Sequence, residues 1–484
     1  MAEPSEQSRP CARCAKLERR VAELEARLQQ VQARYEACLS KLQARVAELE
    51  GLLLEATRAA KRQAAPFSRN QPKTHPKKPG RPVGHPAAHR PAPTPAEITE
   101  TIAVPLDCCP SCGGPLEDLQ THEQIVTDLP EVRPTVRRYV THSGHCPRCN
   151  RRVRSRHPDQ TSDASGAAGN QLGPNALALA ADMKHRLGLS YGKIVELFGT
   201  HYHLHTCPGS LARAGQRLAR LGQRTYRFLV TLLRHSPVVH GDETGWRIAA
   251  RSAWLWVFTN RAVTLYVIRA DRSQAVIREM LGGQFAGVLV SDCFLAYDPI
   301  DVDKQKCLGH LLKDLSAVEA LKSRGAVRFS RAAADILRDA IALKRRRKQL
   351  RAHGYAVACG KIEARMDRLL AGRYADPDNR RLAQRMIKHR EHLFTFLYHQ
   401  AVEPTNNAAE RALRPAVISR KLSAGNRSPT GALAHSILAS LCQTARQNGC
   451  DFLHAAKALL QHRDPDYLAP ILPTWAPACA LAGR

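Results

Sequence analysis

Short apolar segments between residues 237 and 318 follow one another in the order of a mixed α/β sheet. PVVHGD predicts a strand, and WRIAA, AWLWVFT and VTLYVIR continue it as a meander across tight turns. RSQAVIREML is helix-like, AGVLVSD predicts a buried strand, and KQKCLGHLLKDL predicts a strand that runs into a helix. A meander, a helix, a strand and a further strand–helix step therefore predict an α+β domain built on a mixed sheet.

Two of these predicted strands end on an acid, since Asp242 and Asp292 each follow an apolar run directly. In neighbouring strands the two positions would lie side by side at one rim of the sheet. A single strand-end aspartate is ordinary turn chemistry, and that interpretation stays open for each one alone. Paired carboxylates at a rim are typical ligands of Mg²⁺, and two ions ~3.5–4 Å apart can polarise both oxygens in phosphodiester displacement.

A third acid is offered by the segment VEPTNNAAERALRP, residues 402–415. Pro404 and Thr405 favour a helix start, so we expect a helix from Asn406 that ends at Pro415.

Two glutamates of this segment differ in their expected role. Glu410 shares a helix face with Asn406, four residues earlier, and can point into a cleft. Glu403 precedes the helix, where a carboxylate mainly favours the helix dipole. We therefore predict Glu410 as a metal ligand. A surface ion pair between Glu410 and Arg414 is the alternative that the segment alone leaves open.

The motifs HGDETGW, VSDCFLAYD, KCLGHLLKDL and EPTNNAAERALRPAVISRK occur in this order. Together they resemble the transposases of the insertion-sequence-sixty-six family, DDE-type enzymes with a ribonuclease-H-like catalytic core, and the resemblance covers nearly the whole chain. The resemblance implies that Asp242, Asp292 and Glu410 are the catalytic residues and hold two Mg²⁺ or Mn²⁺ ions. It also implies accessory proteins encoded beside the gene. Asn406, Arg411 and Arg414 are expected to position the third acid or to contact DNA phosphate.

Two segments depart from the family pattern. Cys293 stands where members more often carry Tyr or Gly, and the run Cys-Trp-Ala-His-Ala-Arg-Arg appears here as Cys-Leu-Gly-His-Leu-Leu-Lys, residues 307–313. Cys307 and His310 could indicate a second metal site. Without two more ligands we expect them to be packing residues.

The charge of the chain favours a polyanionic partner. Its 484 residues include 73 Lys and Arg against 43 Asp and Glu, a formal net charge of +30, which favours DNA through counterion release. An acidic membrane is the alternative, but no long apolar span is present. The start, MAEPSEQSRP, lacks the apolar core of a signal peptide, so we expect a cytoplasmic, nucleoid-associated protein.

The first hundred residues predict a coiled coil and a linker. Residues 15–60 place apolar side chains at alternating steps of four and three, which is typical of a coiled coil that pairs two copies of the chain; a single amphipathic helix is the alternative. Residues 61–100 are basic and rich in proline, and Arg81 in KKPGRP resembles a minor-groove hook. A plain basic linker is an equal alternative.

Residues 101–160 carry two C-P-x-C knuckles. Cys109 and Cys112, with Cys146 and Cys149, supply the four thiolates that one structural Zn²⁺ requires, and redox-active pairs are the alternative. Cys108 could replace Cys109. We expect residues 125–140 to form a hairpin between the knuckles.

The remaining segments complete the domain prediction. Residues 170–230 predict a helical, helix-turn-helix-like DNA-binding region, or helical packing without DNA contact. Residues 235–440 predict the catalytic domain with an all-helical insertion at 329–400, and 441–484 a helical tail.

These features predict a DNA transposase that binds the terminal inverted repeats of its element, then cleaves and transfers DNA strands. A nuclease of the same fold that does not join DNA, and an inactive DNA-binding protein, are the alternatives.

Overall fold

The computed structural model describes residues 12–61, 84–85, 91–462, 464 and 466–472. The chain divides into two compact units, Met1–Pro91 and Ala92–Arg484. Arg81, the predicted minor-groove residue, lies outside the described residues. No helix among those described is long and apolar enough to cross a membrane.

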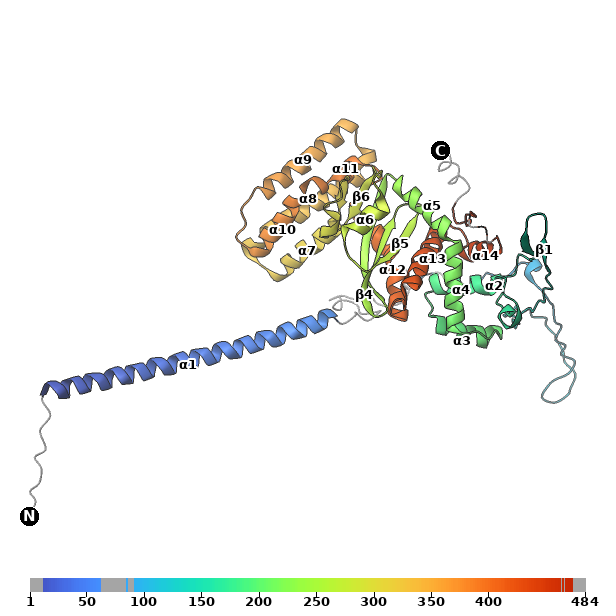
Figure 1. The fold of residues 1–484 in the computed structure, drawn as a ribbon, viewed down its shortest axis with the longest axis horizontal. Coiled ribbons are helices and arrows are strands. Elements are labelled where there is room, and N and C mark those ends of the chain that lie inside the picture. The colour runs from blue at the N-terminus through green and yellow to red at the C-terminus, as the bar shows by residue number, and fades with distance from the viewer. Residues whose placement is uncertain (1–11, 62–83, 86–90, 463, 465, 473–484) are drawn as a thin grey trace, which may run out of the picture. The chain divides into compact units, whose positions relative to one another are not determined.

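The first unit contains one uninterrupted helix, α1 (Ala12–Lys61) (Figure 1). The apolar residues of its heptad pattern are all exposed in the single chain: Leu17, Val21, Leu24, Leu28, Val31, Tyr35 and Leu42. An exposed apolar stripe of this length is what a coiled coil presents to its partner helix.

A five-stranded mixed sheet forms the centre of the second unit, in the order β5-β4-β3-β6-β7. The strands are β3 (Val238–Ile248), β4 (Arg251–Thr259), β5 (Thr264–Arg269), β6 (Val288–Ser291) and β7 (Lys304–Lys306). β3, β4 and β5 pair antiparallel as a meander, whereas β6 and β7 join parallel to β3. The mixed sheet expected from the sequence is confirmed.

Side chains alternate between the two faces of the sheet, and each face is buried. Val239, Trp256 and Leu265 pack in one core with α6 (Gln274–Leu281). Leu255 and Tyr266 lie in the opposite core, against α12 (Asn407–Ser423). Burial on both faces explains why β4 and β5 are largely apolar.

The free edge of β5 is covered by α13 (Pro429–Gln447). Ser436, Ser440 and Thr444, one helical turn apart, accept hydrogen bonds through their side-chain oxygens from the backbone N–H groups of Ile268, Tyr266 and Thr264. Donors two residues apart on a strand thus meet acceptors four residues apart on a helix. The helix thus satisfies backbone donors at an edge of the sheet to which another strand could otherwise add.

Six helices pack with the sheet in a common core. They are α2 (Pro174–His185), α4 (Pro208–Leu221), α5 (Gln223–Arg234), α6, α13 and α14 (Phe452–His462). α3 (Tyr191–Tyr202) lies against α2 and α4. The predicted helical region 170–230 and the predicted tail after 441 therefore share one core with the sheet.

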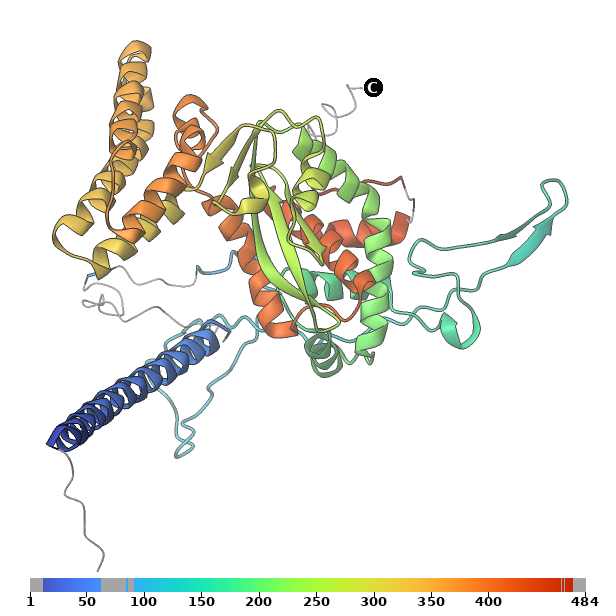
Figure 2. The same cartoon turned by 60° about the vertical axis from the view of Figure 1, so that its left-hand side comes forward.

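A lobe of helices lies beside β7 (Figures 1 and 2). It contains α7 (Leu308–Leu321), α8 (Arg328–Arg345), α9 (Ala352–Leu370), α10 (Pro377–Lys388) and α11 (Thr395–Tyr398). Residues 329–400, where an all-helical insertion was expected, hold no strand.

Residues 92–160 have almost no buried side chains. Their one hairpin joins β1 (Ser143–Cys146) to β2 (Arg151–Arg154). The expected hairpin at 125–140 was wrong, because no residue of that stretch belongs to a strand and nearly all of its side chains are exposed. β propensity reflects packing against neighbouring strands, which this stretch lacks.

Candidate active site

Asp242 and Asp292 lie next to each other at the end of the parallel part of the sheet. The last parallel pair joins His240 of β3 to Val290 of β6, and each aspartate stands two residues beyond this pair, Asp242 within β3 and Asp292 directly after the end of β6. The shared register and the two-residue period place both carboxylates on the same sheet face. Asp242 was expected to follow the end of its strand, but it lies within β3. β3 leaves β6 at this point and continues to Ile248 along β4.

Both aspartates are partly buried and anchored by backbone donors. The N–H of Glu243 donates to Asp242 Oδ1 at 2.8 Å, and the N–H of Phe294 donates to Asp292 Oδ1 at 2.9 Å. Burial is the main cause that raises the pKa of Asp242 to about 7, and the carboxylates of Glu243 and Asp292 contribute. Crowded, desolvated carboxylates of this kind are relieved by a bound cation.

Glu243 points to the other sheet face and is neutralised there. Its side chain, 1% exposed, accepts hydrogen bonds from Arg272 Nη2 at 2.5 Å and from the Tyr297 hydroxyl at 3.0 Å. The Arg272 guanidinium lies over the rings of Trp254 and Phe294, 4.4 and 3.8 Å from their centroids. No role was expected for Glu243, because its pairing with Arg272, 29 residues later, cannot be read from sequence spacing.

The third acid is carried by α12, which begins within one residue of the expected start and ends later than expected. Pro415 lies inside the helix, which continues to Ser423. The expected stop was wrong because the proline removes only the hydrogen bond to the carbonyl of Arg411, an exposed residue whose carbonyl can bond water. The carbonyl of Ala412 receives a further hydrogen bond from the Tyr266 hydroxyl, at 2.5 Å.

Asn406 fastens the start of α12 to the strand that carries Asp242. It is fully buried, and its Nδ2 donates to the carbonyl of Gly241 at 2.8 Å while its Oδ1 lies 3.2 Å from His240 Nδ1. Its backbone N–H donates to Cys307 Sγ at 3.1 Å. Arg420 repeats the attachment farther along, with Nη1 donating to Thr244 Oγ1 at 3.1 Å.

Glu410 follows Asn406 by one turn and faces His310 of α7. The His310 Nε2 and Glu410 Oε1 atoms are 3.9 Å apart. A hydrogen bond with Cys307, together with the carboxylates of Glu410 and Asp292, raises the pKa of His310 to about 9. His310 also interacts electrostatically with Asp242. All three predicted acids thus lie within electrostatic reach of one imidazole.

The closest group of metal-ligand side chains in the described part of the chain is a different one. Ligand atoms of Cys307, His310 and Glu410 all lie within 4.8 Å of one another, whereas Asp242, Asp292 and Glu410 do not form a group that tight. Cys307, which was expected with His310 to be a packing residue, is buried. His310 is exposed beside Glu410, a partner too distant in sequence for its spacing to reveal.

The predicted DNA-contacting residues of this segment divide into two kinds. Arg411 and Arg414 are exposed on α12, where they can reach phosphate. Asn406, which was expected to position the third acid or to contact phosphate, is fully buried and enclosed by β3 and Cys307.

Four of the five cysteines of residues 101–160 form two separate knuckles of free thiols, Cys109 with Cys112 and Cys146 with Cys149. Backbone N–H groups of Ser111 and Cys112 lower the pKa of Cys109, and those of Cys149 and Arg148 do the same for Cys146. These bonds favour Cys109 over Cys108 as the ligand of the first knuckle. The four sulfurs do not gather within 4.8 Å among the described residues, although each knuckle presents two thiols suited to zinc.

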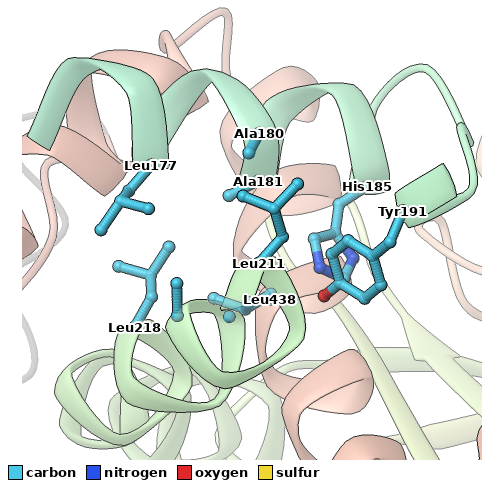
Figure 3. A pocket seen from close by; sticks show the side chains of 10 residues that line it. Leu177, Ala180, Ala181, His185, Tyr191, Leu211, Leu218 and Leu438 are labelled. Carbon is cyan, nitrogen blue, oxygen red and sulfur yellow. The ribbon is translucent and has the colours of Figure 1, made fainter. Parts of the chain in front are cut away.

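One further hollow lies away from the acids, between α2, α3, α4 and α13 (Figure 3). Its wall is apolar apart from His185 and Tyr191. Neither the three acids nor the cysteine pairs line it, so it has no part in the candidate site.

Comparison with known protein families gives one match. The family model described as transposase IS66 family matches residues 169–434, more than half of the chain, and the match includes Asp242, Asp292 and Glu410. No curated protein matches.

Proposed function

The chain belongs to the transposase IS66 family, and from that premise we propose that it is a DDE transposase that cleaves DNA at the ends of its element and joins them to target DNA. Asp242, Asp292 and Glu410 are the catalytic residues. The observation that carries the proposal is the shared face of Asp242 and Asp292, onto which Asn406 fastens the helix of Glu410.

The sheet supports a ribonuclease-H-like core. A three-stranded antiparallel meander followed by two strands parallel to its first member gives the order observed here, with the first acid on the central strand and the second on its parallel neighbour. Ligands of open α/β sheets bind near the carboxyl ends of parallel strands, which is where the two aspartates lie.

The donor set fits hard divalent cations. Asp242, Asp292 and Glu410 offer only carboxylate oxygens, and the crowding that raises the pKa of Asp242 favours a cation among them. Two Mg²⁺ or Mn²⁺ ions held by these residues would activate the attacking oxygen and stabilise the leaving oxygen of a phosphodiester.

The protein's own residues orient the reacting groups. The N–H groups of Glu243 and Phe294 fix one oxygen of each aspartate, so the other stays available for a ligand. Asn406 fixes the start of α12 and thereby the direction of Glu410. Arg411 and Arg414, exposed on the same helix, bind backbone phosphates of the DNA strand.

The other segments supply DNA binding and pairing. Cys109, Cys112, Cys146 and Cys149 hold one structural Zn²⁺, and α1 pairs two copies of the chain so that two element ends meet. The helical region 170–230 and the basic linker, with Arg81, contact the terminal inverted repeats. Element-encoded accessory proteins are further partners. The excess of basic residues supports each DNA contact.

The test is a cleavage and joining reaction with purified full-length protein, Mg²⁺ and DNA that carries the two sequences flanking the gene. We expect joined products with wild type and at least about a 10³-fold loss with Asp292→Asn, because a missing metal ligand removes stabilisation made in the transition state. The matched control is Asp303→Asn, an exposed aspartate of the same domain.

Other outcomes separate the alternatives. Cleaved but unjoined DNA would identify a nuclease of the same fold. Binding without cleavage would identify an inactive DNA-binding protein. Joining that survives Asp292→Asn would overturn the catalytic assignment.

A further inference from the structure

The group formed by Cys307, His310 and Glu410 has a composition unlike that of the three acids. It offers one sulfur, one imidazole nitrogen and one carboxylate oxygen, all within 4.8 Å of one another. Mg²⁺ prefers oxygen ligands, whereas Zn²⁺ binds thiolate, imidazole and carboxylate together. The chemistry of this group therefore selects a different metal from the catalytic one.

Two secondary-structure elements bring the three residues together. Cys307 is the residue before α7, and His310 lies in its first turn, so the spacing of three places both side chains on one side of the helix start. α12 supplies Glu410 from the opposite direction. The N–H of Asn406 donates to Cys307 Sγ at 3.1 Å, and such contacts outside the ligand shell fix the position of a ligand sulfur.

The distances permit a bound ion after a small movement. Zinc bonds of ~2.0–2.3 Å in a tetrahedron imply separations of about 3.4–3.6 Å between ligand atoms. His310 Nε2 and Glu410 Oε1 are 3.9 Å apart, and both side chains are close to half exposed, so they can turn toward the sulfur. Cys307 is buried and stays in place, which makes it the fixed member of the set.

We propose that Cys307, His310 and Glu410 form a binding site for Zn²⁺, with water at the fourth position. A thiolate and a carboxylate balance the charge of the ion, and binding releases the thiol proton and any proton on the imidazole. Three protein ligands and an open fourth position are the arrangement of an accessible zinc site rather than of a closed structural one.

The site has a consequence that rests on the proposed function. Glu410 belongs to both ligand sets, and while its carboxylate binds Zn²⁺ with Cys307 and His310 it is not available to complete the metal site of Asp242 and Asp292. Zn²⁺ would then inhibit strand cleavage even when Mg²⁺ is in excess, because Mg²⁺ competes poorly for a thiolate and an imidazole.

Binding is tested first, without reference to activity. Zn²⁺ bound per full-length chain is measured by equilibrium dialysis, and Co²⁺ is used as a spectroscopic probe of thiolate ligation. We expect wild type to bind one ion more than His310→Ala, an exposed position where folding is not at risk, and one more than Cys307→Ser. Cys359→Ser, which removes a buried thiol of α9, should bind as wild type does. Equal stoichiometry in wild type and His310→Ala would overturn the site.

The inhibitory role is tested separately, by titrating Zn²⁺ into the cleavage reaction at fixed Mg²⁺. Each protein is compared with its own zinc-free rate. We expect Cys307→Ser to need at least about tenfold more Zn²⁺ for half-inhibition than wild type or Cys359→Ser. Equal sensitivity would overturn the inhibitory role and leave the binding result unaffected. A protein that binds the additional ion but never cleaves DNA would refute the proposed function and not the zinc site.

Discussion

The acids of the candidate active site are held in place in two different ways. Asp242 and Asp292 belong to neighbouring strands whose backbone pairing sets their spacing. Glu410 belongs to a helix that lies outside the ladder of the sheet. Side chains such as Asn406 and Arg420 attach the helix itself, and among the described residues backbone hydrogen bonds join only its flanks, at Pro404 and Asn426. Backbone pairing tolerates most substitutions, whereas attachment by a side chain depends on single residues. The position of Glu410 should therefore be the most sensitive part of the site.

Replacing Asn406 tests the side-chain attachment most directly. Asn406→Ala leaves the carbonyl of Gly241 without its donor and removes the side-chain attachment of α12 to β3, while the backbone bond to Cys307 remains, so Glu410 is held less firmly. Displacements near 1 Å cost about 10²-fold in rate, and we expect a loss of that order in strand cleavage. Unfolding measured in parallel should show a loss of about 2 kcal/mol.

Asn379→Ala is the matched control for this change. Asn379 is equally buried and bonds Ser330 and the carbonyl of Ala326, but it does so inside the helical lobe. It should lower stability by a similar amount and leave the cleavage rate of the folded protein near that of wild type. Equal rate losses in the two variants would show that Asn406 matters for stability alone.

Beside the two strand-borne aspartates, the Glu243–Arg272 ion pair is the contact whose loss should affect stability most. Arg272→Ala leaves a carboxylate that is 1% exposed without its cation, beside two further acids. Removing one partner of a buried pair is strongly destabilising, and we expect about 2–3 kcal/mol in denaturant unfolding.

Arg269 offers the control, since its side chain is 37% exposed, as is that of Arg272. Its partner Glu279 is 51% exposed, so Arg269→Ala should cost less than about 1 kcal/mol. If both arginine variants lose the same stability, the burial of Glu243 is not what makes its pair important.

The same division explains what the sequence could predict. The sheet and its two aspartates were predictable because apolar runs, turns and strand ends are local patterns. The continuation of β3 past Asp242 was not, because it depends on β4 pairing farther than β6 does. The helix was correctly placed at its start but not at its end, since tolerance of Pro415 depends on the exposure of Arg411 and not on propensity.

Contacts between distant segments account for the remaining gaps. The C-x-x-H spacing of Cys307 and His310 was visible, but their third partner, Glu410, comes from another helix. The pair of Glu243 and Arg272 likewise joins two elements, with aromatic rings that hold the guanidinium. Neither the approach of Glu410 to Cys307 and His310 nor the Glu243–Arg272 pair leaves a local sequence pattern, so only the folded chain reveals these two contacts.

The smallest expected effect concerns α13, the other helix that side chains attach to the sheet. Its residue His435 is buried against Trp246, His185 and Lys184, and burial lowers its pKa to about 3. Because the folded pKa lies below the unfolded value near 6.5, its contribution to stability is complete above pH 6.5 and is lost as the pH falls. Between pH 7.5 and pH 5 that loss amounts to about 2 kcal/mol.

His435→Gln should remove this part of the pH dependence, measured as the difference in unfolding free energy between pH 7.5 and pH 5. Burial also lowers the pKa of His185, so this second histidine should maintain part of the pH dependence of stability in the variant. His454→Gln, an exposed histidine of α14, should retain the full slope of wild type. If His435→Gln and His454→Gln lose stability equally in acid, α13 is not held by a buried neutral imidazole, and its attachment depends on the hydroxyl contacts with β5 alone.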